Sequence, residues 1–167
     1  MVSVDPTLTI SIDRTSLGLG PLVFSGRTDL NVWGILPGYQ QPGLDPETRV
    51  ASSRFTHGEV ATGFKWRQAM HQFDAFPNVT TAAALTTAKN EVRAALGRLS
   101  YTVTVNENGQ STTWAAQPGT SVPSPIDWPE LDGLYPAFSI TIPCHPLPGA
   151  GGQTAALYVV APTVPLA

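Results

Sequence analysis

This sequence contains few charged residues. Only 13% of its 167 residues are Asp, Glu, Lys or Arg, about half of the usual share of roughly 25%. The nine Lys and Arg residues are scattered along the chain, and the formal net charge is −3. Without a basic stripe, sequence-specific binding of nucleic acid is not expected. A surface so poor in charge either is covered by partner subunits or belongs to a neutral, Thr/Ser-rich β-protein.

Cysteines and long apolar runs are equally scarce. The single cysteine, Cys144, excludes an intramolecular disulfide framework. The longest apolar run, residues 155–162, is too short to span a bilayer, so no membrane insertion is expected. The first thirteen residues lack the basic and apolar regions of a secretory signal. The sequence therefore predicts a protein made soluble in a cytoplasm.

Patterns that carry catalysis or bind metals are also missing. Cys144 and His145 are adjacent, but neighbours on a strand point to opposite faces, so they do not form a thiolate–imidazole pair. His57, His71 and His145 are far apart and lack a metal-ligand spacing. Three acids share a Pro/Gly-rich stretch without the pattern of a calcium loop: Asp127, Glu130 and Asp132. We expect no enzyme, no cofactor and no metal site.

Short strands and turns are what the chain does contain, with 16 Pro and 15 Gly. Apolar and polar residues alternate over Thr7–Ile12, the period of a half-buried strand. Alternation or a short apolar run predicts further strands at Pro21–Phe24, Leu30–Trp33, Phe138–Ile142 (ended by Pro143) and Ala156–Ala161. Residues 118–136 form a Pro-rich connector between strands.

A longer strand and a hairpin lie in the middle of the chain. Alternation over Glu59–His71 places Val60, Thr62, Phe64 and Trp66 on one face of a single long strand. Tyr101–Val105 also alternates, and Thr112–Gln117 returns after a turn that contains Asn108-Gly109. Asn-Gly between two strands is a strong hairpin signal.

One helix is predicted, over residues 80–99. Leu85, Val92, Leu96 and Leu99 follow one another at intervals of seven, four and three, which places them on one apolar stripe. Asn78, Thr80 or Thr81 supplies the N-cap. Gly97 with Arg98 favours the end of the helix. A single amphipathic helix in a β-rich chain packs its stripe against a sheet.

Residues 34–58 are predicted to form a long loop, because Pro-Gly and Gln-Pro-Gly turns replace any periodicity there. Loops of this length are usually functional and often reach onto a neighbouring subunit. The candidate subunit-interface residues therefore lie just before the loop, in it and on the strand that follows, and they are Trp33, Tyr39, Arg49, Arg54, Phe55, His57, Lys65 and Arg67.

Together these elements predict a mainly β fold with one α-helix, as a single domain over residues 1–167. Consecutive strands joined by short turns indicate antiparallel pairing rather than βαβ units. The expected architecture is an antiparallel β-sandwich or split barrel, flanked by the helix at about residues 80–99.

The unit made by the helix TTAAALTTAKNEVRAALGRL, the strand YTVTV, the turn NENG and the strand STTWAAQPG resembles the split-barrel region of siphophage distal tail proteins. It is also similar to minor tail proteins of actinobacteriophages. RFTHGEVATGFKWRQA resembles the strand that leads into the helix in those families. The resemblance covers residues 50 to 120. A full-length distal tail protein carries a second, C-terminal domain, whereas we expect one domain over residues 1–167, with a longer loop at residues 34–58.

The resemblance implies a structural virion protein of the phage tail tip, assembled in the cytoplasm of the bacterial host. Its partners would be further copies of itself in a hexameric ring, the tail tube protein, the hub and the tape-measure protein. The ring would join the tail tube to the hub, and DNA would pass through its lumen. An acidic subunit suits that passage, since a basic lumen would hold phosphates.

Two other functions fit the same sequence. A tail tube or tail terminator protein has the same fold class, but a tube protein stacks into open-ended polymers. A carbohydrate-binding or adhesion module would use exposed aromatic platforms. For that function, Trp33 and Trp128 border loops, whereas Trp66 and Trp114 are predicted to lie in the core.

Overall fold

The computed structural model describes residues 7–26, 33–43, 45–52, 59–125 and 136–147, with the backbone alone described at 46, 49–52 and 59–66. The elements within these ranges are β1 (Thr9–Ile12), the 3-10 helix η1 (Thr15–Leu17), β2 (Leu22–Ser25), β3 (Trp33–Ile35), β4 (Pro46–Ser52), β5 (Glu59–Trp66), β6 (Ala69–Pro77), α1 (Ala82–Leu96), β7 (Tyr101–Glu107), β8 (Gln110–Ala116), β9 (Thr120–Pro123) and β10 (Phe138–Pro146). The strand predicted at Ala156–Ala161 lies outside the described residues.

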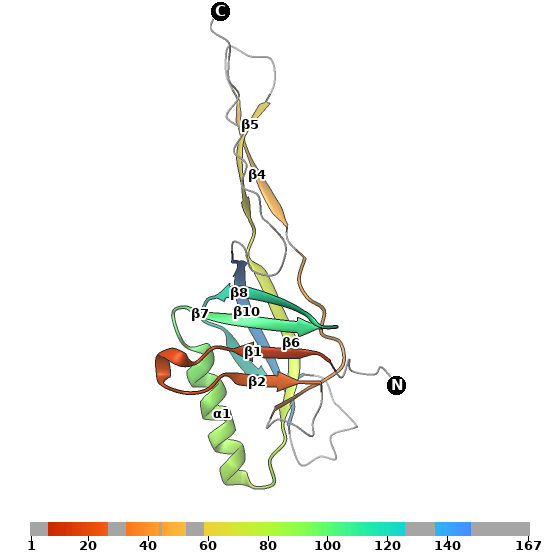
Figure 1. The fold of residues 1–167 in the computed structure, drawn as a ribbon, viewed down its shortest axis with the longest axis vertical. Helices are drawn as coiled ribbons and strands as arrows, with labels where there is room; N and C mark the ends of the chain where they lie inside the picture. Colours follow the sequence, from red (N-terminus) through yellow and green to blue (C-terminus); the bar gives the residue numbers. More distant parts are fainter. Residues whose placement is uncertain (1–6, 27–32, 44, 53–58, 126–135, 148–167) are drawn as a thin grey trace, which may run out of the picture.

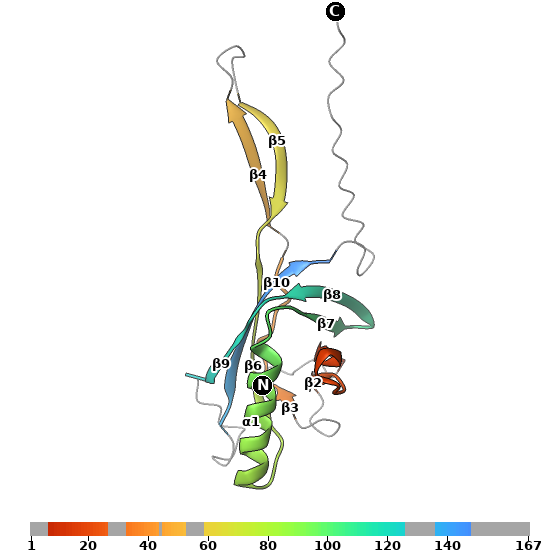
Figure 2. The ribbon, with the colours of Figure 1, turned by 90° about the vertical axis from the view of Figure 1, so that its left-hand side faces the viewer.

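Seven strands close into a barrel. Their order is β6-β3-β2-β1-β7-β8-β10, and β10 returns to pair with β6. β9 pairs with the first half of β10 along the same edge as β8, and α1 lies along the barrel (Figures 1 and 2). All neighbours are antiparallel except β2 and β3, which pair in parallel through Phe24–Trp33 and Ser25–Gly34. The prediction of a mainly β fold with one helix is confirmed, and the closed sheet makes it a barrel.

The barrel interior is filled by the residues that alternation placed on the inner face. Ile10 and Ile12 of β1 and Ile140 and Ile142 of β10 are all fully buried. Their neighbours in sequence are only half-buried. Because successive side chains of a strand point to opposite faces, each of these strands contributes one row to a single core.

The predicted β7–β8 hairpin is confirmed at its turn. Asn108 and Gly109 both have positive φ, at 51° and 76°, and Glu107 pairs directly with Gln110. Two consecutive residues with positive φ make the type I′ turn whose twist matches that of the strands, which is why Asn-Gly is favoured there.

Helix α1 begins as predicted, because the Thr81 hydroxyl accepts a hydrogen bond from the Ala84 amide at 3.2 Å. Val92 and Leu96 are buried against the barrel. The inclusion of Leu99 in the buried stripe is wrong, since this side chain is 88% exposed. The helix ends at Leu96, where the Gly119 amide donates to the Leu96 carbonyl at 2.9 Å. Leu99 therefore lies in the turn that leads to β7.

The sequence predicted that Pro143 ends the strand that begins at Phe138, and this prediction is wrong. β10 continues to Pro146, pairing with β9 through Phe138–Thr141 and with β8 from Cys144 onward. The N–H and C=O of one residue in an antiparallel strand point the same way, and the Pro143 carbonyl accepts from the Gln117 amide. Pro143 has no N–H to donate, and its nitrogen points to the position between the part of β10 that pairs with β9 and the part that pairs with β8. The proline therefore removes no hydrogen bond from either strand pair.

The chain between residues 34 and 77 departs most from prediction. The loop expected over residues 34–58 contains strand β4, and the single strand expected over Glu59–His71 is two strands, β5 and β6, separated at Arg67-Gln68. β4 lacks the apolar alternation by which strands are recognised. Among the described strands, β4 pairs with β5 alone, outside the barrel, where neither of its faces has to meet the core.

Gly119 is the glycine whose replacement has the clearest expected cost. A Cβ atom there would lie 2.7 Å from the Thr141 carbonyl oxygen and 3.2 Å from Leu96 Cδ2. We expect Gly119→Ala to lower the free energy of unfolding by about 1–3 kcal/mol, the usual range for overpacking. Gly20→Ala is the control, because a Cβ there meets nothing within 4 Å. Equal urea midpoints for the two variants would contradict this packing.

Candidate assembly surface

Strands β4 and β5 form a two-stranded arm that projects beyond the end of the barrel (Figures 1 and 2). Pro46 pairs with Trp66 and Glu47 with Lys65, and the register shifts by a bulge between Arg49 and Val50. Among the described strands, β4 and β5 pair only with each other. The arm is therefore a long surface without cover from the barrel.

Arg67 fixes the base of the arm. Its amide donates to the Asp45 carbonyl at 2.8 Å, and its guanidinium lies 3.2 Å from Asp45 Oδ2 and 3.8 Å from Glu47 Oε2. The Arg67 side chain is 61% exposed, and exposed ion pairs contribute well under about 1 kcal/mol. Because these contacts join the two strands where they leave the barrel, their effect is on the direction of the arm more than on stability.

A polar cluster lies inside the barrel behind the segment that leads to the arm. The Tyr39 hydroxyl is 2.8 Å from His71 Nδ1, and the rings of His71 and Trp114 meet edge to face with centroids 4.8 Å apart. His71 is fully buried, and burial lowers the pKa of its imidazole from 6.5 to about 4. Burial also raises the pKa of Tyr39. The imidazole is thus neutral at physiological pH, and it anchors Tyr39 against the barrel.

The predicted interface residues fall into three groups. Trp33 belongs to the barrel core, with 1% of its surface exposed, and its burial leaves no surface for a partner. Tyr39 is half-buried over His71, whereas Arg67 is exposed at the base of the arm. The other predicted residues lie on the arm or outside the described residues. Arg49 and Lys65 are on strands β4 and β5, and Arg54, Phe55 and His57 are outside.

Asp45, Glu47 and His71 are the residues of this surface that the sequence did not single out as interface positions. Asp45-Pro46 is typical of a turn, so nothing in the sequence indicated that Asp45 forms an ion pair with Arg67. His71 occupies an inward position of β6, two residues before Phe73. An inward histidine next to a tyrosine-bearing loop is the signal that could have found the cluster.

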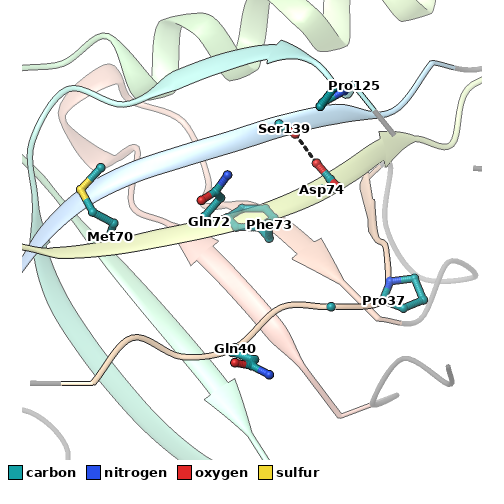
Figure 3. A pocket seen from close by; sticks show the side chains of 9 residues that line it. Pro37, Gln40, Met70, Gln72, Phe73, Asp74, Pro125 and Ser139 are labelled. Atoms are coloured by element: carbon teal, nitrogen blue, oxygen red, sulfur yellow. Dashed lines mark hydrogen bonds between the residues drawn. The ribbon is translucent and has the colours of Figure 1, made fainter. Parts of the chain in front are cut away.

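A shallow pocket of about 370 Å³ lies on the outer face of β6 and β10, beside the segment that follows β3 (Figure 3). Gln72 and Asp74 line it from β6, and the Ser139 hydroxyl donates to an Asp74 carboxylate oxygen. Pro37 and Gln40 form the opposite wall. No imidazole or thiol is among the lining residues, so Ser139 has no partner there that would make it a nucleophile.

The thiol considered for catalysis is on the other side of the sheet. Cys144 is fully buried, while His145 is half-buried on the opposite face of β10. Burial raises the pKa of the Cys144 thiol to about 12, so it stays protonated at neutral pH. Among the described residues, no three His, Cys, Asp or Glu side chains gather to hold a metal ion. The one described α-helix is also too short and too polar to cross a membrane.

No family model matches this chain, and no curated protein matches it either. Among solved structures, the chain is similar to the Dit protein of SPP1, described as a paradigm of the hub adsorption apparatus in phages that infect Gram-positive bacteria. The sequences are 15% identical, the TM-score is 0.47, and the match covers 83% of this chain and 49% of the other. This chain thus spans about half the length of that protein.

Proposed function

We propose that this protein is a structural subunit of a bacteriophage tail that joins copies of itself through the β4–β5 arm. The more specific proposal is a hexameric ring at the tail tip, between the tail tube and the hub, in the virion. The observation that carries the proposal is the arm, which leaves the barrel with no described strand beside it.

An isolated two-stranded ribbon is marginally stable in water, because it has no third layer to bury its side chains. The arm of this protein is seven residues long on β4 and eight on β5, and Arg67 ties down its base. A partner subunit that covers the arm would supply the missing layer. An arm that docks on a different surface of the next copy makes a heterologous contact, the type of contact that closes into rings.

The phage assignment rests on the resemblance of residues 80–117 to the helix–hairpin unit of distal tail proteins. That unit folds as α1 followed by the β7–β8 hairpin. The low charge of the sequence and its net charge of −3 suit a subunit that is largely covered and that lets DNA slide past. The tube, the hub and the tape-measure protein are the proposed partners, and assembly takes place in the host cytoplasm.

A tail tube or terminator protein is the second proposal, since the same barrel and arm would serve it. The carbohydrate-binding alternative has lost one of its two candidate aromatic platforms, because Trp33 is buried in the barrel, and the other, Trp128, lies outside the described residues.

Removing the arm is expected to abolish assembly without unfolding the barrel. In this variant, a short Gly-Ser turn replaces residues 47–65 between Pro46 and Trp66. We expect a monomer by mass photometry, where the unaltered chain gives rings by negative-stain microscopy, and an unchanged melting temperature. A tube protein would instead give open-ended stacks.

A pair of single substitutions provides the matched control. Thr48→Asp adds a charge to an exposed site on the arm, and Ser111→Asp adds the same charge to an exposed site on the β7–β8 hairpin. Only Thr48→Asp should weaken assembly. A monomeric unaltered chain at every concentration would refute the proposed function.

A further inference from the structure

Three exposed leucines lie on two segments that Arg98 joins by hydrogen bonds, at a place that the arm of the same chain does not cover. Leu17 and Leu19 lie in and after η1 and are 44% and 51% exposed, and Leu99 follows the end of α1 and is 88% exposed. We call these three residues the leucine patch. Burying a leucine is worth about 1.5–3 kcal/mol, so leaving three of them in water forgoes a large stabilisation.

Arg98 joins the two segments that carry the patch. Its Nε donates to the Ala95 carbonyl at 3.0 Å, at the end of α1. Its Nη1 donates to Ser16 Oγ at 3.2 Å, and its Nη2 donates to the Asp13 carbonyl. The guanidinium also lies 4.8 Å from the centre of the Tyr101 ring. Arg98 immediately precedes Leu99, so its hydrogen bonds hold the η1 segment close to Leu99.

Arg14 holds the same segment from its other end. Its Nε donates to the Gly20 carbonyl at 2.7 Å, and its guanidinium lies 3.7 Å from the Glu91 carboxylate on α1. Gly18, between the two exposed leucines, has a φ of 67°, which glycine adopts without strain. The loop is thus fixed to α1 through Glu91 and to the segment after α1 through Arg98, and the leucines are displayed on a preformed surface rather than on a slack loop.

Preformed apolar surfaces bind with less loss of conformational entropy. Exposed apolar groups that cluster on a rigid scaffold are also typical of interaction sites. We propose that the leucine patch is the surface on which the β4–β5 arm of a second copy docks. This inference rests on the proposed function, and it names the surface that receives the arm.

The size of the two surfaces favours the arm as the occupant. Three partly exposed leucines fall short of the roughly 800 Å² per partner that a stable interface buries. A strand of eight residues extends for roughly 25 Å, so an arm laid over the patch would cover it and also the neighbouring surface of η1 and α1. The sequence of β5 includes Phe64 and Trp66, residue types that gain free energy by burying apolar surface.

The location of the patch requires that the arm come from another copy. Figure 1 shows the arm leaving the barrel at one end, while η1 and the end of α1 lie at its side. A contact between such different surfaces is head-to-tail, so each copy gives its arm to one neighbour and receives an arm from the other.

Charged substitutions in the patch test the inference. In the variant Leu17→Asp with Leu99→Asp, we expect the assembled species to fall at least tenfold by mass photometry, with the melting temperature retained. The matched control is Gln110→Asp with Ser111→Asp, which adds two charges to exposed sites of the β7–β8 hairpin, away from the patch and from α1. The control should assemble like the unaltered chain.

Cross-linking supplies a second readout that adds no charge to the patch. Leu99→Cys combined with Thr48→Cys places one thiol in the patch and one on the arm, and the native Cys144 is buried. Mild oxidation should give a ladder of disulfide-linked multimers on a non-reducing gel. Each single-cysteine variant should stop at dimers or monomers.

The outcomes separate the two proposals. If Thr48→Asp prevents assembly while the patch variant assembles normally and no ladder forms, then the arm docks elsewhere, and only the docking inference fails. If the unaltered chain remains monomeric, both the function and the inference fail.

Discussion

Replacing Trp33 with alanine is expected to lower the free energy of unfolding by about 4 kcal/mol, within the range measured for large aromatic residues in protein cores. Trp33 is 1% exposed, and its ring lies 5.6 Å from that of Phe24 and 6.0 Å from that of Phe138, centre to centre. It therefore joins β2 and β3 to β10 across the barrel. Urea unfolding followed by circular dichroism measures the loss.

Trp33→Phe is the matched control for this prediction. The Trp33 Nε1 atom is buried without a hydrogen-bond partner among the described residues, so phenylalanine removes volume but breaks no hydrogen bond. We expect its cost to be clearly smaller than that of alanine. If Trp33→Ala instead kept the stability of the unaltered chain but lost assembly, Trp33 would be an interface residue rather than a core residue.

Lowering the pH from 6.5 to 4 is expected to destabilise the barrel by about 3 kcal/mol through His71 alone. Burial lowers the pKa of this imidazole from 6.5 to about 4, and each pKa unit corresponds to about 1.4 kcal/mol. Between these two pH values the unfolded chain binds a proton that the folded chain excludes. Stability therefore falls as the pH falls through this window, and His71 adds no further loss below it.

His71→Leu tests this pH dependence, because it fills a similar volume without a titrating group. The free energy of unfolding, measured in urea at several pH values between 6.5 and 4, should lose most of its slope. Tyr39→Phe is the control, since it removes the hydroxyl that faces His71 Nδ1 and leaves the imidazole. Hydrogen bonds from Thr15 lower the pKa of Asp13 below 3.8, so that carboxyl acts at still lower pH. An unchanged slope in His71→Leu would exclude His71 as its source.

Local patterns predicted the elements whose partners are close in sequence. Asn108-Gly109 fixed the hairpin, because its twist depends on two residues alone. Thr81 and Gly97 marked the ends of α1, because capping acts within one turn. Alternation found β1, β7 and β10, since each has one face in the core, whereas β9 lies inside the stretch predicted as a connector over residues 118–136. These parts depend on physics that acts over a few residues.

Long-range pairing explains what the sequence could not predict. The sequences of β6 and β10 contain no signal that these strands pair with each other, yet their pairing closes the barrel. Trp33 borders a turn-rich stretch, and only the neighbours of β3 make it a core residue. Leu99 continues the spacing of the apolar residues of the helix, but α1 ends at Leu96 because the chain turns there toward β7. The arm was not predicted because β4 lies outside the barrel and therefore lacks the apolar alternation of a strand that covers a core.

The closure of the barrel has a consequence for how the chain folds. Residues 138–144 pair with residues 69–75, so β10 can be placed only after a long segment between them has been ordered, and contacts that distant slow folding. Until β10 is in place, β6 and β8 both lack a neighbour, and open strand edges attract other chains. Refolding at high concentration should therefore compete with aggregation up to that step, after which the barrel strands are sealed and association is left to other surfaces.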